Sequence, residues 1–136
     1  SQEDLKARVR ELTGGEGAHV IYDPVGGAYA EPALRSIAWA GRYLVVGFAA
    51  GEIPKIQLNL TLLKGCQIVG VFWGSFAMRD PEANQAHARR IFEMIAAGTL
   101  QPHIDVVLPF EQAAEALQRL ESRRAKGKVV LTPRPV

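Results

Sequence analysis

Three short runs of apolar residues recur at a regular spacing in the first half of the sequence. They cover residues 18–22, 43–46 and 67–72, they are rich in β-branched side chains, and patterns typical of helices separate them. Runs of this length that are apolar almost throughout are typical of strands buried in a parallel sheet. Strands that alternate with helices also pair in parallel through right-handed crossovers. The sequence therefore predicts an α/β fold built on one parallel sheet.

The chain is predicted to begin on a helix. Ser1 and Asp4 resemble a capping box, and Gly14 and Gly15 end the helical pattern. A second helix should follow the first strand, and Gly41 should turn the chain into the second strand. The residues of this second helix that we expect to face inward are Ala30, Leu34, Ile37 and Ala38.

The second half of the sequence predicts one long helix, two strands and a shorter helix between them. Asp80 and Pro81 supply an N-cap and a first-turn proline for the long helix, which Gly98 ends. The strands are expected over residues 104–108 and 128–132.

The change of pattern after the third strand indicates a domain boundary, and no flexible linker marks it. Residues 1–74 are expected to form an α/β unit around one parallel sheet. Residues 75–136 are expected to form a C-terminal α+β segment.

Composition and charge narrow the range of partners. Sixteen basic and fourteen acidic side chains leave a net charge of +2, which gives no reason to expect nucleic acid or an acidic membrane surface. Cys66 is the single cysteine and cannot form an intramolecular disulfide, which favours a reducing, cytoplasmic location. No apolar stretch approaches the roughly 18 residues of a membrane span, and the first ten residues lack the apolar core of a signal peptide.

Each predicted strand of the first half runs into a loop that contains glycine. In an open parallel sheet, ligands bind beyond the carboxyl ends of the strands. A single glycine there is more often a plain turn residue, and Phe48 and Trp73 could equally be core aromatics. Three such loops in succession nevertheless favour a ligand. The loops are residues 23–27, then Val46, Gly47 and Phe48, then Phe72, Trp73 and Gly74.

The usual fingerprint for binding a pyrophosphate is not in the sequence. No Gly-x-Gly-x-x-Gly follows a strand, and the glycine cluster at residues 14–17 ends a helix and does not open one. The three histidines are scattered, and no serine has a histidine at a catalytic spacing. Arg123 lies in a basic cluster that is typical of a solvated helix end. The residues alone thus indicate no nucleophile and no metal ligand.

Several segments taken together resemble one known family, in the family's own order. They are residues 12–15, 20–27, 41–48, 59–64, 113–117 and 127–131. The chain resembles the zinc-independent quinone-reductase branch of the medium-chain dehydrogenase/reductase superfamily, over nearly its whole length. It departs from that pattern at its N-terminus, where a catalytic lobe and the first Rossmann strands should precede Ser1. The resemblance therefore implies a C-terminal fragment. Residues 1–74 would be the C-terminal half of a Rossmann dinucleotide-binding domain, with a partial doubly wound parallel sheet. Residues 75–136 would be the C-terminal segment of the catalytic domain.

The resemblance implies hydride transfer from NADPH to a quinone or an activated alkene, with no catalytic metal. It also implies a homodimer along the strand at residues 67–72. Because the pyrophosphate site is missing, the chain alone should be inactive. The cofactor-binding residues carried over by position are Val46, Gly47, Phe48, Phe72, Trp73, Gly74 and Arg123, with Arg124 as an alternative to the last.

Two alternatives stay open from the sequence. One is a non-catalytic α/β module that assembles with a partner through the edge of its sheet. The other is an enoyl-reductase segment of a larger synthase, which shares the chemistry but has different neighbouring domains. The choice between NADPH and NADH is also open, because the strand end that recognises the ribose is not in this sequence.

Overall fold

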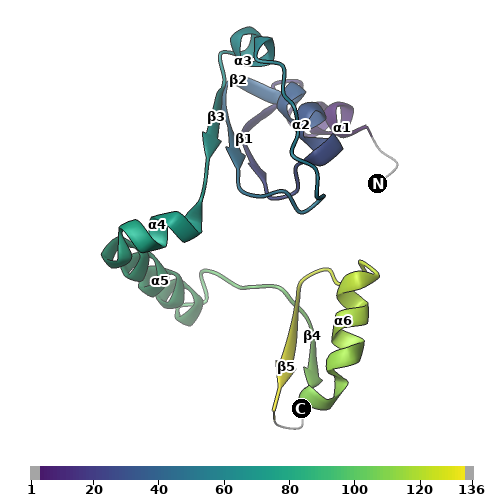
Figure 1. Ribbon diagram of the computed structural model, residues 1–136, viewed down its shortest axis with the longest axis vertical. Coiled ribbons are helices and arrows are strands. Elements are labelled where there is room, and N and C mark those ends of the chain that lie inside the picture. The colour runs from purple at the N-terminus through teal and green to yellow at the C-terminus, as the bar shows by residue number, and fades with distance from the viewer. Residues whose placement is uncertain (1–3, 134–136) are drawn as a thin grey trace. The chain divides into compact units, whose positions relative to one another are not determined.

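The computed structural model describes residues 4–133 and divides into two compact units, Ser1–Phe76 and Ala77–Val136. Each unit has its own parallel sheet. Figure 1 labels the elements of both. The assignment of residues 1–74 and 75–136 to two different domains stays a prediction.

The first unit is a three-stranded sheet in the order β1-β2-β3, and both pairs of strands are parallel. This confirms the prediction of one parallel sheet from the three apolar runs. The elements are α1 (Leu5–Leu12), β1 (Ala18–Asp23), the short 3-10 helix η1 (Gly27–Tyr29), α2 (Ala30–Arg35), β2 (Ile37–Val45), α3 (Asn59–Lys64), β3 (Gln67–Gly70) and the start of α4 (Trp73–Arg79).

The first helix begins one residue after Asp4, which is itself the N-cap. Its Oδ1 accepts hydrogen bonds from the amides of Lys6 (2.9 Å) and Ala7 (3.1 Å). The predicted capping box is therefore wrong about the role of Asp4, and Ser1 lies outside the described residues. The helix ends as predicted, with the amide of Gly15 donating to the carbonyl of Arg10 at 2.7 Å.

The second helix is shorter than predicted, and the second strand is longer. Helix α2 ends at Arg35 because Ser36 donates from its hydroxyl and its amide to the carbonyl of Ala33. Ile37, which was expected on the helix, opens β2. The chain does bend before Gly41, where Ala40 has a φ of 58°. The bend interrupts the register with β1 but lies within β2 and not before it.

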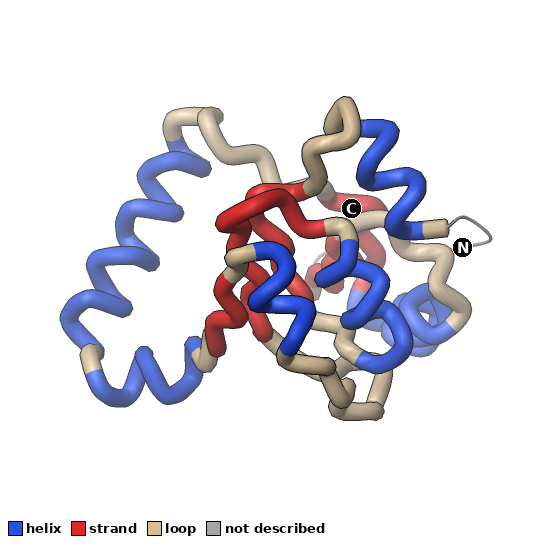
Figure 2. Tube along the Cα trace, turned by 90° about the horizontal axis from the view of Figure 1, so that it is seen from above, coloured by secondary structure: helices blue, strands red, loops and turns tan. Residues whose placement is uncertain are grey.

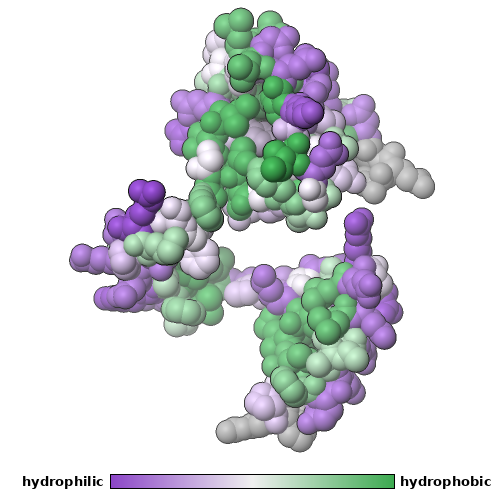
Figure 3. Space-filling model, viewed as in Figure 1, coloured by the Kyte–Doolittle hydropathy of each residue, from purple (hydrophilic) through white to green (hydrophobic). Residues whose placement is uncertain are grey.

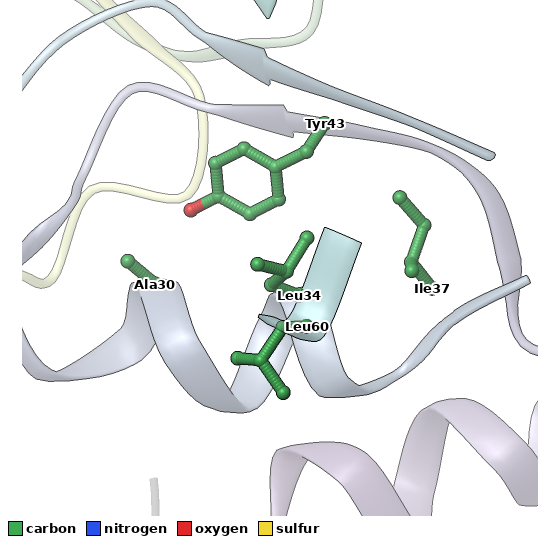
Figure 4. Packing of buried hydrophobic residues seen from close by; sticks show 5 residues of the cluster. All are labelled: Ala30, Leu34, Ile37, Tyr43 and Leu60. Carbon is green, nitrogen blue, oxygen red and sulfur yellow. The ribbon is translucent and has the colours of Figure 1, made fainter. Parts of the chain in front are cut away.

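A small core forms between one face of the sheet and the helices. Figure 4 shows the ring of Tyr43 extending from β2 toward Leu34 and Ala30 on α2. Ile37 and Leu60 complete this buried cluster. On the opposite face of the sheet, alternate residues such as Val20 and Tyr22 of β1 are exposed. The sheet is therefore packed on one side within the described residues.

The third strand is shorter than the apolar run that predicted it. It ends at Gly70, although the amide of Val71 still donates to the carbonyl of Val45 at 2.8 Å. Trp73 opens helix α4, so the predicted loop at Trp73 and Gly74 is wrong. The end of β3 and the start of α4 are both apolar, so the composition of the sequence does not reveal where the strand stops and the helix begins.

The second unit contains α5 (Pro81–Ala96), β4 (Ile104–Pro109), the 3-10 helix η2 (Phe110–Gln112), α6 (Ala113–Glu121) and β5 (Lys128–Thr132). A short break in the helical trace separates α4 from α5 (Figure 2), and Asp80 at this break caps α5 by accepting from the amide of Ala83 at 3.0 Å. This confirms the predicted N-cap. Strands β4 and β5 pair in parallel through α6.

Hydrophobic side chains remain exposed on the second unit. Figure 3 shows them gathered over β4 and β5, and Ile104, Val107 and Leu117 are among the exposed residues. A part-buried ion pair between Arg119 of α6 and Asp105 of β4, at 2.9 Å, ties the helix to the strand. None of the helices in residues 4–133 is long and apolar enough to cross a membrane.

Candidate functional site

The loops that follow β1 and β2 are joined by backbone hydrogen bonds at the carboxyl edge of the sheet. The carbonyl of Asp23 accepts from the amides of Val46 (2.9 Å) and Gly47 (3.3 Å). These bonds extend the pairing of the two strands into the loops. Further bonds run from the amides of Ala49, Ala50 and Gly27 to the carbonyls of Pro24, Val25 and Glu52, at 3.1, 2.9 and 3.1 Å respectively.

The carboxylate of Asp23 also holds this edge together. Its Oδ1 accepts from the amides of Val25 (2.8 Å) and Gly26 (2.9 Å), which fixes the turn after β1. Its Oδ2 accepts from the hydroxyl of Tyr43, whose side chain is 4% exposed and part of the core. One residue thus links the turn, the neighbouring loop and the packed interior.

The two side chains shift each other's ionisation. Burial alone would raise the pKa of Asp23, but the hydrogen bonds from Tyr43, Gly26 and Val25 hold that pKa below its ordinary value of 3.8. Burial raises the pKa of Tyr43 above its ordinary value of 10.0, and the hydrogen bond to Asp23 and the negative charge of Asp23 raise it further. The pair is therefore held as a carboxylate and a neutral phenol.

A pocket with a volume of about 400 Å³ lies where β2 and β3 end. Its walls are mostly apolar, with two aromatic rings and two glycines among them. Four of the seven site residues predicted from the sequence line it together, namely Val46, Gly47, Phe48 and Phe72. The full lining is Val45, Val46, Gly47, Phe48, Gly70, Val71 and Phe72.

Glycine is required at one position that shapes this pocket. Gly26 has a φ of 67° and a ψ of −144°, a conformation that side chains with a Cβ rarely adopt. A Cβ on Gly26 would also lie 2.9 Å from Cδ1 of Phe48. The glycine therefore lets the ring of Phe48 lie directly against the turn after β1.

The other three predicted residues are placed differently. Trp73 is the first residue of α4, and a Cβ on Gly74 would lie 3.5 Å from Cε2 of Phe72, so both follow the pocket directly in the chain. Arg123 belongs to the second unit, where it follows α6 with a φ of 55°. Its part in the site stays a prediction.

Sequence reasoning included Asp23 in a loop but missed its role, and it missed Tyr43 altogether. The signal was the register of the sheet. Ile21 is paired with Tyr43, and Asp23 lies two residues further along β1, so Asp23 and Tyr43 share one face of the sheet. Among residues 4–133, no group of three or more histidine, cysteine or acidic side chains could hold a metal ion.

Comparison with known proteins places the chain in a family. The family model described as zinc-binding dehydrogenase matches residues 1–131. The chain belongs to this family. A Nematostella vectensis protein named quinone oxidoreductase-like protein 2 homolog is 39% identical over 132 residues, which cover 96% of this chain and 36% of the relative.

Solved structures in the family share the fold. A quinone oxidoreductase from Pseudomonas syringae superposes with a TM-score of 0.77 at 31% identity. A mycobacterial protein solved in complex with NADPH superposes with a TM-score of 0.79 at 28% identity. In both comparisons 98% of this chain covers 41% of the other. The predicted partial Rossmann fold and the resemblance to quinone reductases are confirmed, and the chain spans well under half the length of these proteins.

Proposed function

We propose that this chain is the C-terminal part of a cytoplasmic reductase that transfers hydride from NADPH to a quinone or an activated alkene. The observation that carries the proposal is the apolar pocket at the ends of β2 and β3, in a chain similar to quinone oxidoreductases. Ligands of open parallel sheets bind at this edge. The similarity to an NADPH complex supports the choice of cofactor.

The residues of the pocket suit the nicotinamide end of a dinucleotide. Phe48 and Phe72 are aromatic walls for a flat ring, and the backbone at Gly47 has no side chain to keep a ring away. Val46 would complete this border, and Trp73 with Gly74 would extend the same wall into α4. In the proposal, Arg123 or Arg124 lies near the cofactor, and no metal takes part.

The protein's contribution to such a reaction would be position and exclusion of water. The cofactor supplies the hydride when it is bound. The apolar walls would keep water from the reacting face of the nicotinamide. The loops after β1 and β2, which are joined by hydrogen bonds, would hold the nicotinamide ring at a fixed position in the pocket. Proximity of this kind contributes most when the reacting atoms are held roughly 3 to 3.5 Å apart.

The groups that give a dinucleotide most of its affinity are not in this chain. Pyrophosphate binding needs the glycine-rich turn and the helix N-terminus of the first Rossmann strand, and the sequence contains no such fingerprint. We therefore expect the 136-residue chain to bind NADPH weakly or not at all and to have no reductase activity.

The test compares this chain with a protein extended upstream through the preceding lobe. NADPH consumption is followed by absorbance with a quinone and, separately, with an enone. The extended protein should consume NADPH with at least one acceptor, and the short chain with neither. Inactivity of the extended protein toward both acceptors, or turnover by the short chain, would contradict the proposed site. The same assay with NADH decides which nucleotide is used.

A second proposal concerns assembly through the outer edge of β3. This strand pairs with β2 on one side, and its four residues are all exposed. A strand edge with free backbone groups favours pairing with another strand. We propose a homodimer along residues 67–72. The same edge supports the alternative of a non-catalytic module, which the NADPH assay above separates from the reductase.

A further inference from the structure

We infer that Asp23 is a positioning residue for the nicotinamide pocket, with Tyr43 as the buried partner that holds its carboxylate in place. This inference rests on the function proposed above. It concerns two residues that do not line the pocket at the ends of β2 and β3. They act on that pocket through the backbone of Val46 and Gly47.

The first step of the argument is the number of bonds that meet at Asp23. Its carbonyl accepts from Val46 and Gly47, both of which line the pocket. Its carboxylate accepts from Val25 and Gly26 in the turn after β1. The conformation of that turn and the position of the pocket loop are therefore set by the same residue.

The second step is the anchoring of Asp23 to the interior. Tyr43 donates from its hydroxyl to Asp23, and its ring packs against Leu34 within the buried cluster (Figure 4). A packed ring is fixed in its rotamer, so the hydroxyl is a fixed donor. The carboxylate is held from the core on one oxygen and by the turn on the other.

The third step is the contact between the turn and an aromatic wall. The amide of Gly26 donates one of the hydrogen bonds that Asp23 accepts, and Gly26 lies against Phe48, which forms part of the pocket. Movement of the turn would shift Phe48 as well as Gly47. Two parts of the pocket wall thus depend on the carboxylate of Asp23.

Loss of this carboxylate should affect hydride transfer more than binding. Most of the dinucleotide's affinity comes from its pyrophosphate and adenosine, which bind elsewhere, so the Kd for NADPH should change by less than about threefold. Misplacement of a reacting group by 1 Å costs about 100-fold in rate, so even a partial shift of the ring should slow the hydride step by about tenfold.

The experiment uses the extended protein and the variants Asp23→Ala, Asp23→Asn and Tyr43→Phe. Tyr22→Phe is the matched control, because Tyr22 lies on the neighbouring strand but is 65% exposed on the other face of the sheet. Three quantities are measured for each protein. They are the Kd for NADPH, the single-turnover rate of hydride transfer with its isotope effect from deuterated NADPH, and hydrogen exchange of the peptide covering residues 45–50.

Asp23→Ala and Tyr43→Phe should slow hydride transfer, increase the isotope effect on turnover and leave the Kd nearly unchanged. Exchange at residues 45–50 should be about tenfold faster, because the carboxylate's hydrogen bonds no longer fix Asp23, whose backbone carbonyl accepts from Val46 and Gly47. Asp23→Asn should lie between these variants and the wild type, since the amide oxygen can still accept from the turn. The control should match the wild type in all three measurements.

The outcomes separate the two proposals. An extended wild-type protein without activity overturns the proposed function, while faster exchange in the variants would still support the role of Asp23 in holding the loop. An active wild type whose Tyr43→Phe and Asp23→Asn variants retain the wild-type hydride rate and exchange overturns the inference. If Asp23→Ala fails to fold, the measurements on Tyr43→Phe and Asp23→Asn decide the inference. If the variants contain less active protein but keep the wild-type hydride-transfer rate per bound NADPH, Asp23 does not position the pocket and the inference is overturned.

Discussion

The stability that is lost when Tyr43→Phe removes one hydroxyl should depend on pH in a defined way. The hydroxyl is buried and donates to a carboxylate. Hydrogen bonds to charged groups contribute about 1.5–3 kcal/mol. Phenylalanine keeps the packing against Leu34, so the loss should come from the hydrogen bond. We expect the free energy of unfolding to fall by about 2 kcal/mol near neutral pH, the middle of that range.

The sign of the pH dependence follows from the two shifted groups. The pKa of Tyr43 is raised in the folded protein, so its contribution is complete below its ordinary value of 10.0 and is lost as pH rises above it. The pKa of Asp23 is lowered, so its contribution is complete above its ordinary value of 3.8 and is lost as pH falls toward the folded-state value. The difference in the free energy of unfolding between wild type and variant should therefore be constant between pH 3.8 and pH 10.0 and should shrink outside this range.

Urea denaturation of the extended protein, followed by circular dichroism at a series of pH values, measures this difference. Tyr22→Phe serves as the control, because it removes an exposed hydroxyl from the neighbouring strand. The control should remain within about 0.5 kcal/mol of the wild type, as surface substitutions usually do. A difference for Tyr43→Phe that does not shrink above pH 10.0, or one no larger than that of the control, would refute the reasoning.

Two further predictions concern the turn after β1 and the outer edge of the sheet. Gly26→Ala should lower the free energy of unfolding by about 1–3 kcal/mol through backbone strain, with an added loss from contact with Phe48. Gly51→Ala is its control, since Gly51 has a positive φ but no atom within 4 Å of a Cβ, and equal losses in urea denaturation would exclude the Phe48 contact. Val69→Lys should weaken the β3 dimer by about tenfold or more in light scattering, because like charges would meet across the new pair. Val20→Lys, on β1, should leave the dimer intact, and a wild-type monomer at high concentration would rule out this interface.

Much of the fold was visible in the sequence because strands of a parallel sheet leave a simple pattern. The apolar runs predicted all three strands of the first unit, and Asp80 with Pro81 predicted the start of α5. The end of α2 was missed because Ile37 fits an inward helical position as well as a buried strand position. The decisive bonds, from Ser36 back to Ala33, carry no strong sequence signal.

The candidate site was predictable in part for a related reason. Loops at strand ends can be found from the sequence, and four of the predicted residues do line one pocket. The bond between Asp23 and Tyr43 joins residues twenty positions apart, so it could be found only once the register of β1 and β2 was known. Arg123 was assigned from the family resemblance alone, because the basic cluster around it is typical of any solvated helix end.

The bonds between the loops after β1 and β2 give the pocket two walls of unequal stiffness. The Gly47 wall is held by a series of backbone hydrogen bonds to the neighbouring turn. The Phe72 wall lies past the end of β3, beyond the bond from Val71 to Val45, and its ring is 77% exposed. If the proposed function holds, substitutions at Phe72 would reshape the space offered to an acceptor without disturbing the frame on which the cofactor would rest. Acceptor preference would then change first at this wall.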